Sequence, residues 1–183
     1  MTRIAFTGLP RVGKDTAGEY LCEKFHFRRL AFGDYMKEKY FELFPHKKND
    51  PKDREGLIAF GQTCVEIDNR VWIRQVESRM GLLERMWAPD GFIITDLRQD
   101  HEYEWAKKHD FTVVEIMSHK GEARQRELGE KVAKDIRGTF KPDMYISNVT
   151  SVDDFHRSLD TLMEALRGRQ VEYTGEIGKE DIR

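Results

Sequence analysis

Short runs of apolar residues alternate along this chain with longer stretches in which apolar residues recur at every third or fourth position. The short runs are typical of strands buried on both faces of a sheet, and the longer stretches are typical of amphipathic helices. We predict strands over residues 4–6, 27–32, 92–95, 112–116 and 143–148, and helices over 17–25, 35–43, 54–65, 72–86, 102–109 and 153–166. Their alternation predicts an α/β fold with a three-layer α/β/α arrangement and a parallel sheet.

The segments between these elements show where helices start and where loops run. Asp68 or Asn69 is a candidate N-cap for the helix over 72–86, and the polar segment 46–53 is predicted to be a surface loop. A charged segment at about 118–141 is predicted to form a short lid, and the polar tail 168–183 is predicted to be loose. The chain 1–183 is expected to be a single domain, because its length suits one compact unit.

The turn after the first predicted strand has the sequence of a phosphate-binding loop, as in P-loop NTPases. It reads Gly8-Leu9-Pro10-Arg11-Val12-Gly13-Lys14-Asp15-Thr16 and leads directly into the first predicted helix. Glycines let backbone N–H groups turn inward, the helix N-terminus adds positive potential, and the lysine reaches the outer phosphates. A glycine-rich turn that only leads into a helix is the alternative. The predicted ATP-binding residues are Gly8, Arg11, Val12, Gly13, Lys14, Asp15 and Thr16.

Asp15 stands where phosphate loops usually have Ser or Thr directly after the lysine, and Thr16 follows it. Magnesium binds oxygen ligands and keeps several waters, so the Asp15 carboxylate could hold the ion directly or through water. Thr16 would then bond a phosphate oxygen. Lys14, Arg11 and Asp15 are accordingly predicted to be catalytic, with Asp15 also a metal-binding candidate.

Two charged residues follow the buried strand over 92–95. Ligands of parallel sheets bind at the carboxyl ends of the strands, and Asp96 and Arg98 are spaced so that their side chains share one side. Asp96 suits a water-mediated contact to magnesium or a base at the acceptor, and Arg98 suits a bidentate clamp on an acceptor phosphate. The alternative is an ion pair at the strand end.

Asp34, just past the second strand, either orients the acceptor or caps a helix.

Further arginines are weaker candidates. Arg124 and Arg126 lie in the predicted lid, where cations would neutralise the charge that spreads during phosphoryl transfer. The alternative is a solvated helix face with ion pairs. Arg70, which precedes Trp72, is a candidate for binding the acceptor base or phosphate, although a tryptophan at helical spacing is more often part of a core.

Composition narrows the class of protein. The 31 Lys and Arg residues nearly balance 33 Asp and Glu, so the basic footprint of a nucleic-acid binder is absent. Cys22 and Cys64 lie far apart, and the six histidines have no metal-ligand spacing, so magnesium arriving with a nucleotide is the metal we expect. No apolar run approaches the ~20 residues of a membrane span. We therefore expect a cytoplasmic protein without nucleic-acid or membrane partners; a homodimer stays open.

Four motifs together resemble the phage-type deoxynucleoside monophosphate kinases, within the wider nucleoside monophosphate kinase group. They are Arg11 to Thr16, the pair Gly61-Gln62-Thr63 and Asn69-Arg70-Val71-Trp72-Ile73, the segment Ile94-Thr95-Asp96-Leu97-Arg98 followed by Glu102, and Asp143-Met144-Tyr145-Ile146-Ser147-Asn148. They are spread over nearly the whole chain up to about residue 166. The chain departs from the family in the lid, where Ala133-Lys134-Asp135-Ile136-Arg137 stands in place of more polar sequences.

The resemblance implies a phosphotransferase that moves the γ-phosphoryl group of ATP, with magnesium, to a deoxynucleoside 5′-monophosphate. It implies that Lys14 and Arg11 hold phosphates, that Asp15 supports the reacting centre, and that Arg98 contacts the acceptor, with Glu102 beside it. The nearest alternative is a dephospho-coenzyme A kinase or another small-molecule kinase on the same fold. A different alternative is a regulatory protein that binds ATP without turnover, for which the loop alone would suffice.

Overall fold

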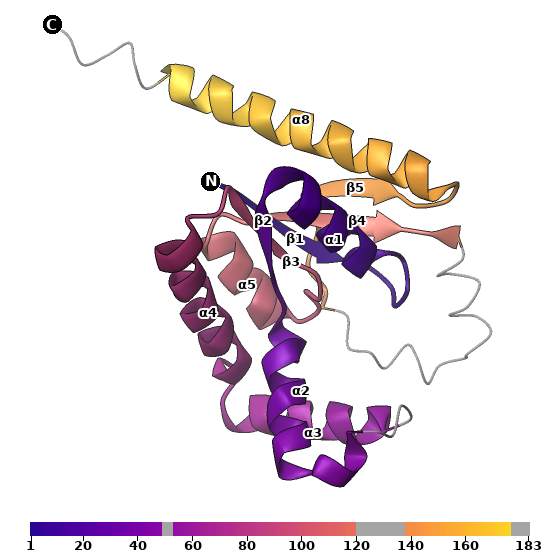
Figure 1. Cartoon of the computed structure of the whole chain (residues 1–183), viewed down its shortest axis with the longest axis vertical. Helices are drawn as coiled ribbons and strands as arrows, with labels where there is room; N and C mark the ends of the chain where they lie inside the picture. Colours follow the sequence, from indigo (N-terminus) through magenta and orange to yellow (C-terminus); the bar gives the residue numbers. More distant parts are fainter. Residues whose placement is uncertain (49–52, 120–137, 177–183) are drawn as a thin grey trace, which may run out of the picture.

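The computed structural model describes residues 1–48, 53–119 and 138–176, with side chains up to residue 168. In chain order, the elements are β1 (Thr2–Thr7), α1 (Lys14–Phe25), β2 (Phe27–Leu30), α2 (Phe32–Leu43), the 3-10 helix η1 (Pro45–Lys47), α3 (Arg54–Ile67), α4 (Val71–Trp87), β3 (Gly91–Ile94), α5 (Asp100–Lys108), β4 (Thr112–Met117), β5 (Met144–Ser147) and α8 (Val152–Glu176) (Figure 1).

The sheet has the strand order β2-β3-β1-β4-β5, and the paired strands are all parallel. β1 lies in the centre, with Ile4 opposite Ile93 of β3 and opposite Thr112 of β4. Parallel strands need crossover connections, which the helices supply. The carboxyl ends of β1, β2 and β3 therefore meet at one edge of the sheet, and the predicted parallel α/β fold is confirmed.

Side chains that alternate along each strand build two cores, one on each face of the sheet. Ile4 and Phe6 of β1 are fully buried with residues of α1 and α8, whereas Ala5 between them packs with residues of α4 and α5. Figure 1 shows α1 and α8 on one side of the sheet and α4 and α5 on the other. This is the three-layer arrangement that buried parallel strands require, because both of their faces are apolar.

Helices α2 and α3 extend beyond the carboxyl edge of the sheet, as Figure 1 shows. Aromatic rings join them to α4: the ring centroids of Tyr40 and Phe60 are 5.5 Å apart, and those of Phe60 and Trp72 are 6.1 Å apart. Tilted aromatic contacts of this kind stabilise packing beyond the area that they bury. The three helices thus form one side of the space above the sheet edge.

Several predicted boundaries differ from the structure. β2 ends at Leu30 and α2 already begins at Phe32, because the first backbone amides of α2 are bonded by a distant carboxylate, that of Asp96. α4 begins at Val71 after the N-cap position of Arg70. Neither Asp68 nor Asn69 caps it; Asp68 accepts the Arg70 N–H instead.

The ends of the chain and the charged segments also call for comparison. The prediction of a loose tail from residue 168 is wrong as far as Glu176, since α8 continues to that residue. A single glycine within a helix costs only about 1 kcal/mol, so Gly168 does not end it.

Part of the predicted 46–53 loop belongs to η1. Residues 120–137, which make up most of the predicted lid, lie outside the described residues. Within the described part, no helix combines the length and apolar character needed to cross a membrane.

Candidate active site

The loop between β1 and α1 adopts a conformation that only glycine permits at two positions. Gly8 and Gly13 have φ angles of 131° and 106°. A Cβ atom at Gly8 would lie 2.5 Å from the Ile116 carbonyl oxygen, and one at Gly13 would lie 2.6 Å from Nδ2 of Asn148. Arg11, with φ of 66°, is also left-handed. The chain therefore turns tightly around a space that faces the N-terminus of α1.

Lys14 begins α1 and is 8% exposed. Its ammonium group donates hydrogen bonds to the carbonyl oxygens of Gly8, at 2.9 Å, and Leu9, at 2.7 Å. The lysine thus closes the loop on itself and keeps a positive charge at its centre. No side chain caps the N-terminus of α1. Backbone amides, a helix end and an ammonium group are the combination that binds phosphate.

Asn148 supports this loop from the far edge of the sheet. It follows β5, its backbone N–H donates to the Met117 carbonyl, and its side-chain Nδ2 donates to the Val12 carbonyl at 2.8 Å. At the other end of the same motif, the Asp143 carboxylate accepts the Val113 N–H at 2.7 Å. The motif at 143–148 therefore fixes β5 on β4 and the loop on β5.

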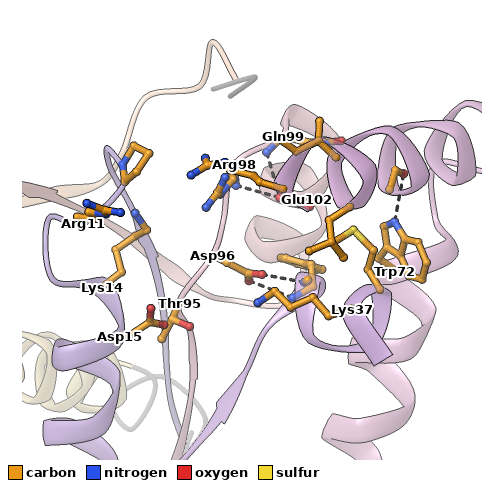
Figure 2. Close-up of a pocket in the computed structure, with 18 of the residues that line it drawn as sticks. Arg11, Lys14, Asp15, Lys37, Trp72, Thr95, Asp96, Arg98, Gln99 and Glu102 are labelled. Atoms are coloured by element: carbon orange, nitrogen blue, oxygen red, sulfur yellow. Dashed lines mark hydrogen bonds between the residues drawn. The ribbon is translucent and has the colours of Figure 1, made fainter. Parts of the chain in front are cut away.

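A cavity of about 590 Å³ joins the loop to the helices above the sheet edge (Figure 2). Three groups of residues line it. The loop and α1 supply Pro10, Arg11, Gly13, Lys14, Asp15 and Thr16; the segment after β3 supplies Thr95, Asp96, Arg98, Gln99 and Glu102; β2 and helices α2, α3 and α4 supply Arg29, Phe32, Gly33, Met36, Lys37, Arg54, Leu57, Ile58, Gly61, Gln62, Val65 and Trp72. We call the lining residues of α2, α3 and α4 the α2–α4 wall.

Asp96 lies between the two ends of the cavity. Its carboxylate accepts the backbone N–H of Phe32 at 3.0 Å through Oδ1 and that of Gly33 at 2.8 Å through Oδ2. Burial raises the pKa of Asp96 above its ordinary value, while these two amides and Arg98 act in the opposite direction. Asp96 does line the cavity, as the sequence predicts, but both of its oxygens bond the start of α2.

Arg98 and Glu102 form a second unit at this edge. Oε2 of Glu102 accepts the N–H groups of Arg98, at 2.9 Å, and Gln99, at 3.0 Å, in a capping box that starts α5. The Arg98 carbonyl accepts the N–H of Gly138 at 2.6 Å. Burial, and then the nearby Asp96 carboxylate, raises the pKa of Glu102 to about 8. The backbone of Arg98 is thus held on both sides while the residue lines the cavity.

Arg29 is a cavity residue that we did not predict from the sequence. Its Nε donates to Oγ1 of Thr95 at 3.0 Å, Nη1 pairs with Asp34 at 2.6 Å, and Nη2 lies 3.6 Å from Asp15.

Alternation along β2 places Arg29 and Leu30 on opposite faces, but it does not reveal which residues they meet. Lys37, one turn after Gly33, was missed for the same reason.

The structure brings together some predicted residues and separates others. Arg11, Gly13, Lys14, Asp15, Thr16, Asp96, Arg98 and Glu102 all line the cavity, while Gly8 and Val12 shape the loop. Asp34 lies outside the lining, in the first turn of α2, and pairs with Arg29; the N-cap position is Ala31. Arg70 is exposed, pairs with Glu77 and lies away from the cavity. Trp72 belongs both to the core and to the lining. Arg124 and Arg126 lie outside the described residues.

The carboxylates of the cavity fit a magnesium ion that arrives with phosphates better than one held by the protein alone. Among the described residues, no group of three or more His, Cys, Asp or Glu side chains is placed to hold a metal. The Asp15 side chain is 77% exposed and lines the cavity beside Lys14, whereas Asp96 bonds two amides. Magnesium typically uses one or two carboxylates together with water and substrate phosphates. Asp15 fits that role.

Comparison with known proteins agrees with this fold. No protein-family model and no curated protein matches the chain. Among solved structures, it is similar to the dephospho-CoA kinase from Campylobacter jejuni, with 13% identity, a TM-score of 0.52, and coverage of 92% of this chain and 100% of that one. It is also similar to a sugar kinase from Janibacter sp., with 11% identity, a TM-score of 0.53, and coverage of 90% and 95%. At such identities the likeness shows the fold alone, a three-layer α/β/α arrangement that this chain shares with the two kinases.

Proposed function

We propose that this protein is an ATP-dependent kinase that transfers the γ-phosphoryl group to the phosphate of a deoxynucleoside 5′-monophosphate. The observation that carries the proposal is one continuous cavity with a phosphate loop at one end and an apolar wall with cations at the other. Arg98 and Lys37 stand between the two ends, as Figure 2 shows. Two substrates that exchange a phosphoryl group need this end-to-end arrangement.

At the loop end, Lys14, Arg11 and the first amides of α1 would hold the β- and γ-phosphates of ATP. Magnesium, when bound with ATP, would neutralise charge between these phosphates, with Asp15 as its protein ligand. Phosphoryl transfer proceeds mainly through positioning and neutralisation of charge, so these residues have little covalent chemistry to perform.

Between the two ends of the cavity, the charges favour an anionic acceptor. Arg98 and Lys37 would bind a phosphate, and a phosphate oxygen is already a nucleophile, so it needs no general base. A hydroxyl acceptor would need one. Of the three carboxylates that line the cavity among the described residues, Asp96 and Glu102 each accept two backbone amides, and Asp15 is the proposed magnesium ligand. This supports a phosphate acceptor over a sugar hydroxyl.

The α2–α4 wall suits a nucleobase. Phe32, Met36 and Trp72 offer apolar surface to a flat ring, and the amide of Gln62 could bond its edge. That the acceptor is a deoxynucleotide rather than a ribonucleotide is inferred from the sequence resemblance. Localisation in the cytoplasm stays a prediction from the sequence, which leaves a homodimer open.

The test is ADP release from Mg-ATP with a panel of deoxy- and ribonucleoside monophosphates and dephospho-coenzyme A. We expect stimulation by one or more deoxynucleotides and a loss on the order of 10³-fold in Lys14→Ala, as when a charge-stabilising group is removed from an active site. Lys24→Ala, on the exposed last turn of the same helix, is the matched control.

The other outcomes separate the alternatives. Stimulation by dephospho-coenzyme A alone would show that this compound, and not a nucleoside monophosphate, is the acceptor. ATP binding without stimulation by any acceptor would refute the kinase and favour a regulatory ATP-binding protein.

A further inference from the structure

We propose that Asp96 is a positioning residue whose carboxylate holds the first turn of α2 against the end of β3 and so fixes the α2–α4 wall relative to the phosphate loop. The expected effect of Asp96 on acceptor binding rests on the proposed function, whereas the contact between Asp96 and α2 does not. The sequence suggests a different role for Asp96, that of a metal ligand or base, so the two roles make opposite predictions.

The first turn of α2 depends on Asp96 because the helix has no cap of its own. The first N–H groups of any helix lack partners within the helix. The N-cap position here is Ala31, whose methyl side chain cannot accept a hydrogen bond. Oδ1 and Oδ2 of Asp96, 64 and 63 residues away, accept the N–H groups of Phe32 and Gly33 in its place. A carboxylate at a helix N-terminus also stabilises the helix dipole.

Gly33 allows the close approach that this contact needs. A Cβ atom at Gly33 would lie 3.1 Å from Oδ2 of Asp96, which is tighter than ordinary packing. A larger residue would therefore push the carboxylate away from the amide. The glycine and the aspartate act as one contact, made by two segments that are distant in sequence.

The residue before Asp96 strengthens the same junction. The Thr95 N–H donates to the Leu30 carbonyl at 3.4 Å, and Oγ1 of Thr95 accepts from Nε of Arg29. Arg29 in turn pairs with Asp34, in the first turn of α2. Adjacent residues at the end of β3 thus hold α2 through backbone amides and through an arginine bridge.

The position of α2 matters to the site because of what the helix carries. Met36 and Lys37 line the cavity one turn after the junction, and α2 then packs against α3 through Tyr40 and Phe60. A small change in direction at the start of a helix is amplified along its length. Loss of the Asp96 contact should therefore move Lys37 and the α2–α4 wall, and acceptor binding should weaken more than the chemical step.

The test compares Asp96→Asn, which keeps one carbonyl oxygen, Asp96→Ala, which keeps none, and Asp90→Asn as the control. Asp90 is exposed at the other end of the same strand, so this control makes the same change of charge away from the cavity. We expect hydrogen exchange of the Phe32 and Gly33 amides to quicken by about tenfold in Asp96→Asn and by more in Asp96→Ala. Exchange in the phosphate loop should not change.

Kinetics separate positioning from metal binding. We expect the acceptor KM to rise about tenfold in Asp96→Asn, matching the expected increase in amide exchange at the start of α2. The Mg²⁺ concentration that gives half of the maximal rate should stay unchanged. A raised Mg²⁺ requirement with an unchanged acceptor KM would overturn the proposal and restore the metal role. Unchanged exchange at Phe32 and Gly33 would also overturn it.

The exchange measurement needs no substrate, so it distinguishes a failure of this proposal from a failure of the kinase assignment. If no acceptor stimulates the enzyme but the exchange quickens, the kinase assignment fails and the structural contact stands. Gly33→Ala disturbs the junction without altering the carboxylate. We expect it to quicken exchange of the same amides, and an unchanged rate in this variant would count against the junction.

Discussion

The two ends of the cavity are built in different ways. The phosphate loop is a run of nine consecutive residues whose backbone conformation depends on Gly8 and Gly13. The α2–α4 wall is assembled from side chains on three helices, and residues after β3 line the cavity with it. A site formed by the backbone of one loop can be predicted from a short sequence motif. A site formed by side chains of several helices depends on how distant elements pack.

The helix ends that face the cavity show the same contrast. The N-terminus of α1 has no side-chain cap, so its amides stay available for phosphate. The N-terminus of α2 is occupied by the Asp96 carboxylate, and that of α5 by the Glu102 carboxylate. Of these three helix N-termini, that of α1 is the one without a side-chain cap. This difference agrees with the proposal that the donor phosphates bind at α1.

The largest expected effect concerns the buried carboxyl group of Glu102, which caps α5. The pKa of Glu102 is about 8 in the folded protein and 4.5 ordinarily, so the unfolded chain releases this proton first as the pH rises. The folded state then binds more protons, and its stability falls between about pH 4.5 and 8. Glu102→Gln keeps an oxygen for the two amides and removes the titration. We expect it to be more stable than the wild type by on the order of 3 kcal/mol at pH 8 and about equal to it at pH 4.

Denaturant unfolding at several pH values measures this difference. Glu104→Gln, at an exposed position two residues further along α5, is the control and should follow the wild type at every pH. A Glu102→Gln variant that loses stability in parallel with the wild type as the pH rises would show that Glu102 is already ionised in the folded protein at neutral pH.

The next prediction compares Arg98 and Arg70, two arginines that are both predicted from the sequence to bind the acceptor. Arg98 lines the cavity and Arg70 does not, so Arg98→Ala should raise the acceptor KM by about 10- to 100-fold, the loss expected for charge-assisted hydrogen bonds. Arg70→Ala should leave the acceptor KM close to that of the wild type, because Arg70 pairs with Glu77 at the surface. Equal effects of the two substitutions on the acceptor KM would contradict the acceptor end assigned here.

The smallest effect concerns the support of the phosphate loop. Asn148→Ala removes the hydrogen bond from Nδ2 to the Val12 carbonyl and should weaken ATP binding by about fivefold, close to the value of one hydrogen bond. Acceptor KM should change little, since Asn148 lies away from the α2–α4 wall. Titration of ATP against the variant, with exposed Asn69→Ala as control, measures this. A larger effect on the acceptor than on ATP would show that the two ends are not built separately.

Prediction from the sequence succeeded where the signal is local. The strands over 92–95 and 112–116 stand out as apolar runs, and the structure has β3 and β4 there. The segment 8–16 was predicted to be a loop that leads into a helix, and the structure has a glycine-dependent turn there and α1 from Lys14. Glu102 was predicted beside Arg98 at the acceptor; in the structure it lines the cavity and forms the capping box of α5.

Prediction was incomplete where a residue acts on a distant partner. Asp96 was recognised as a charged group at a strand end, but nothing nearby in sequence indicates that its oxygens bond amides 63 and 64 residues away. Arg29 and Lys37 carry no local sign of the cavity that they line. Arg70 was expected at the acceptor because it lies beside Trp72, yet the direction in which α4 packs turns it toward Glu77 and the surface.

The sequence by itself determined the α/β pattern, the phosphate loop and the charged residues after β3, since each depends on periodicity or on neighbours within one turn. Only the tertiary structure decided which carboxylates cap α2 and α5, that α1 has no side-chain cap, and which cations face the cavity. The physical reason is that capping and cavity formation join groups that are distant along the chain. Their free energy depends on packing between elements, which a sequence pattern does not specify.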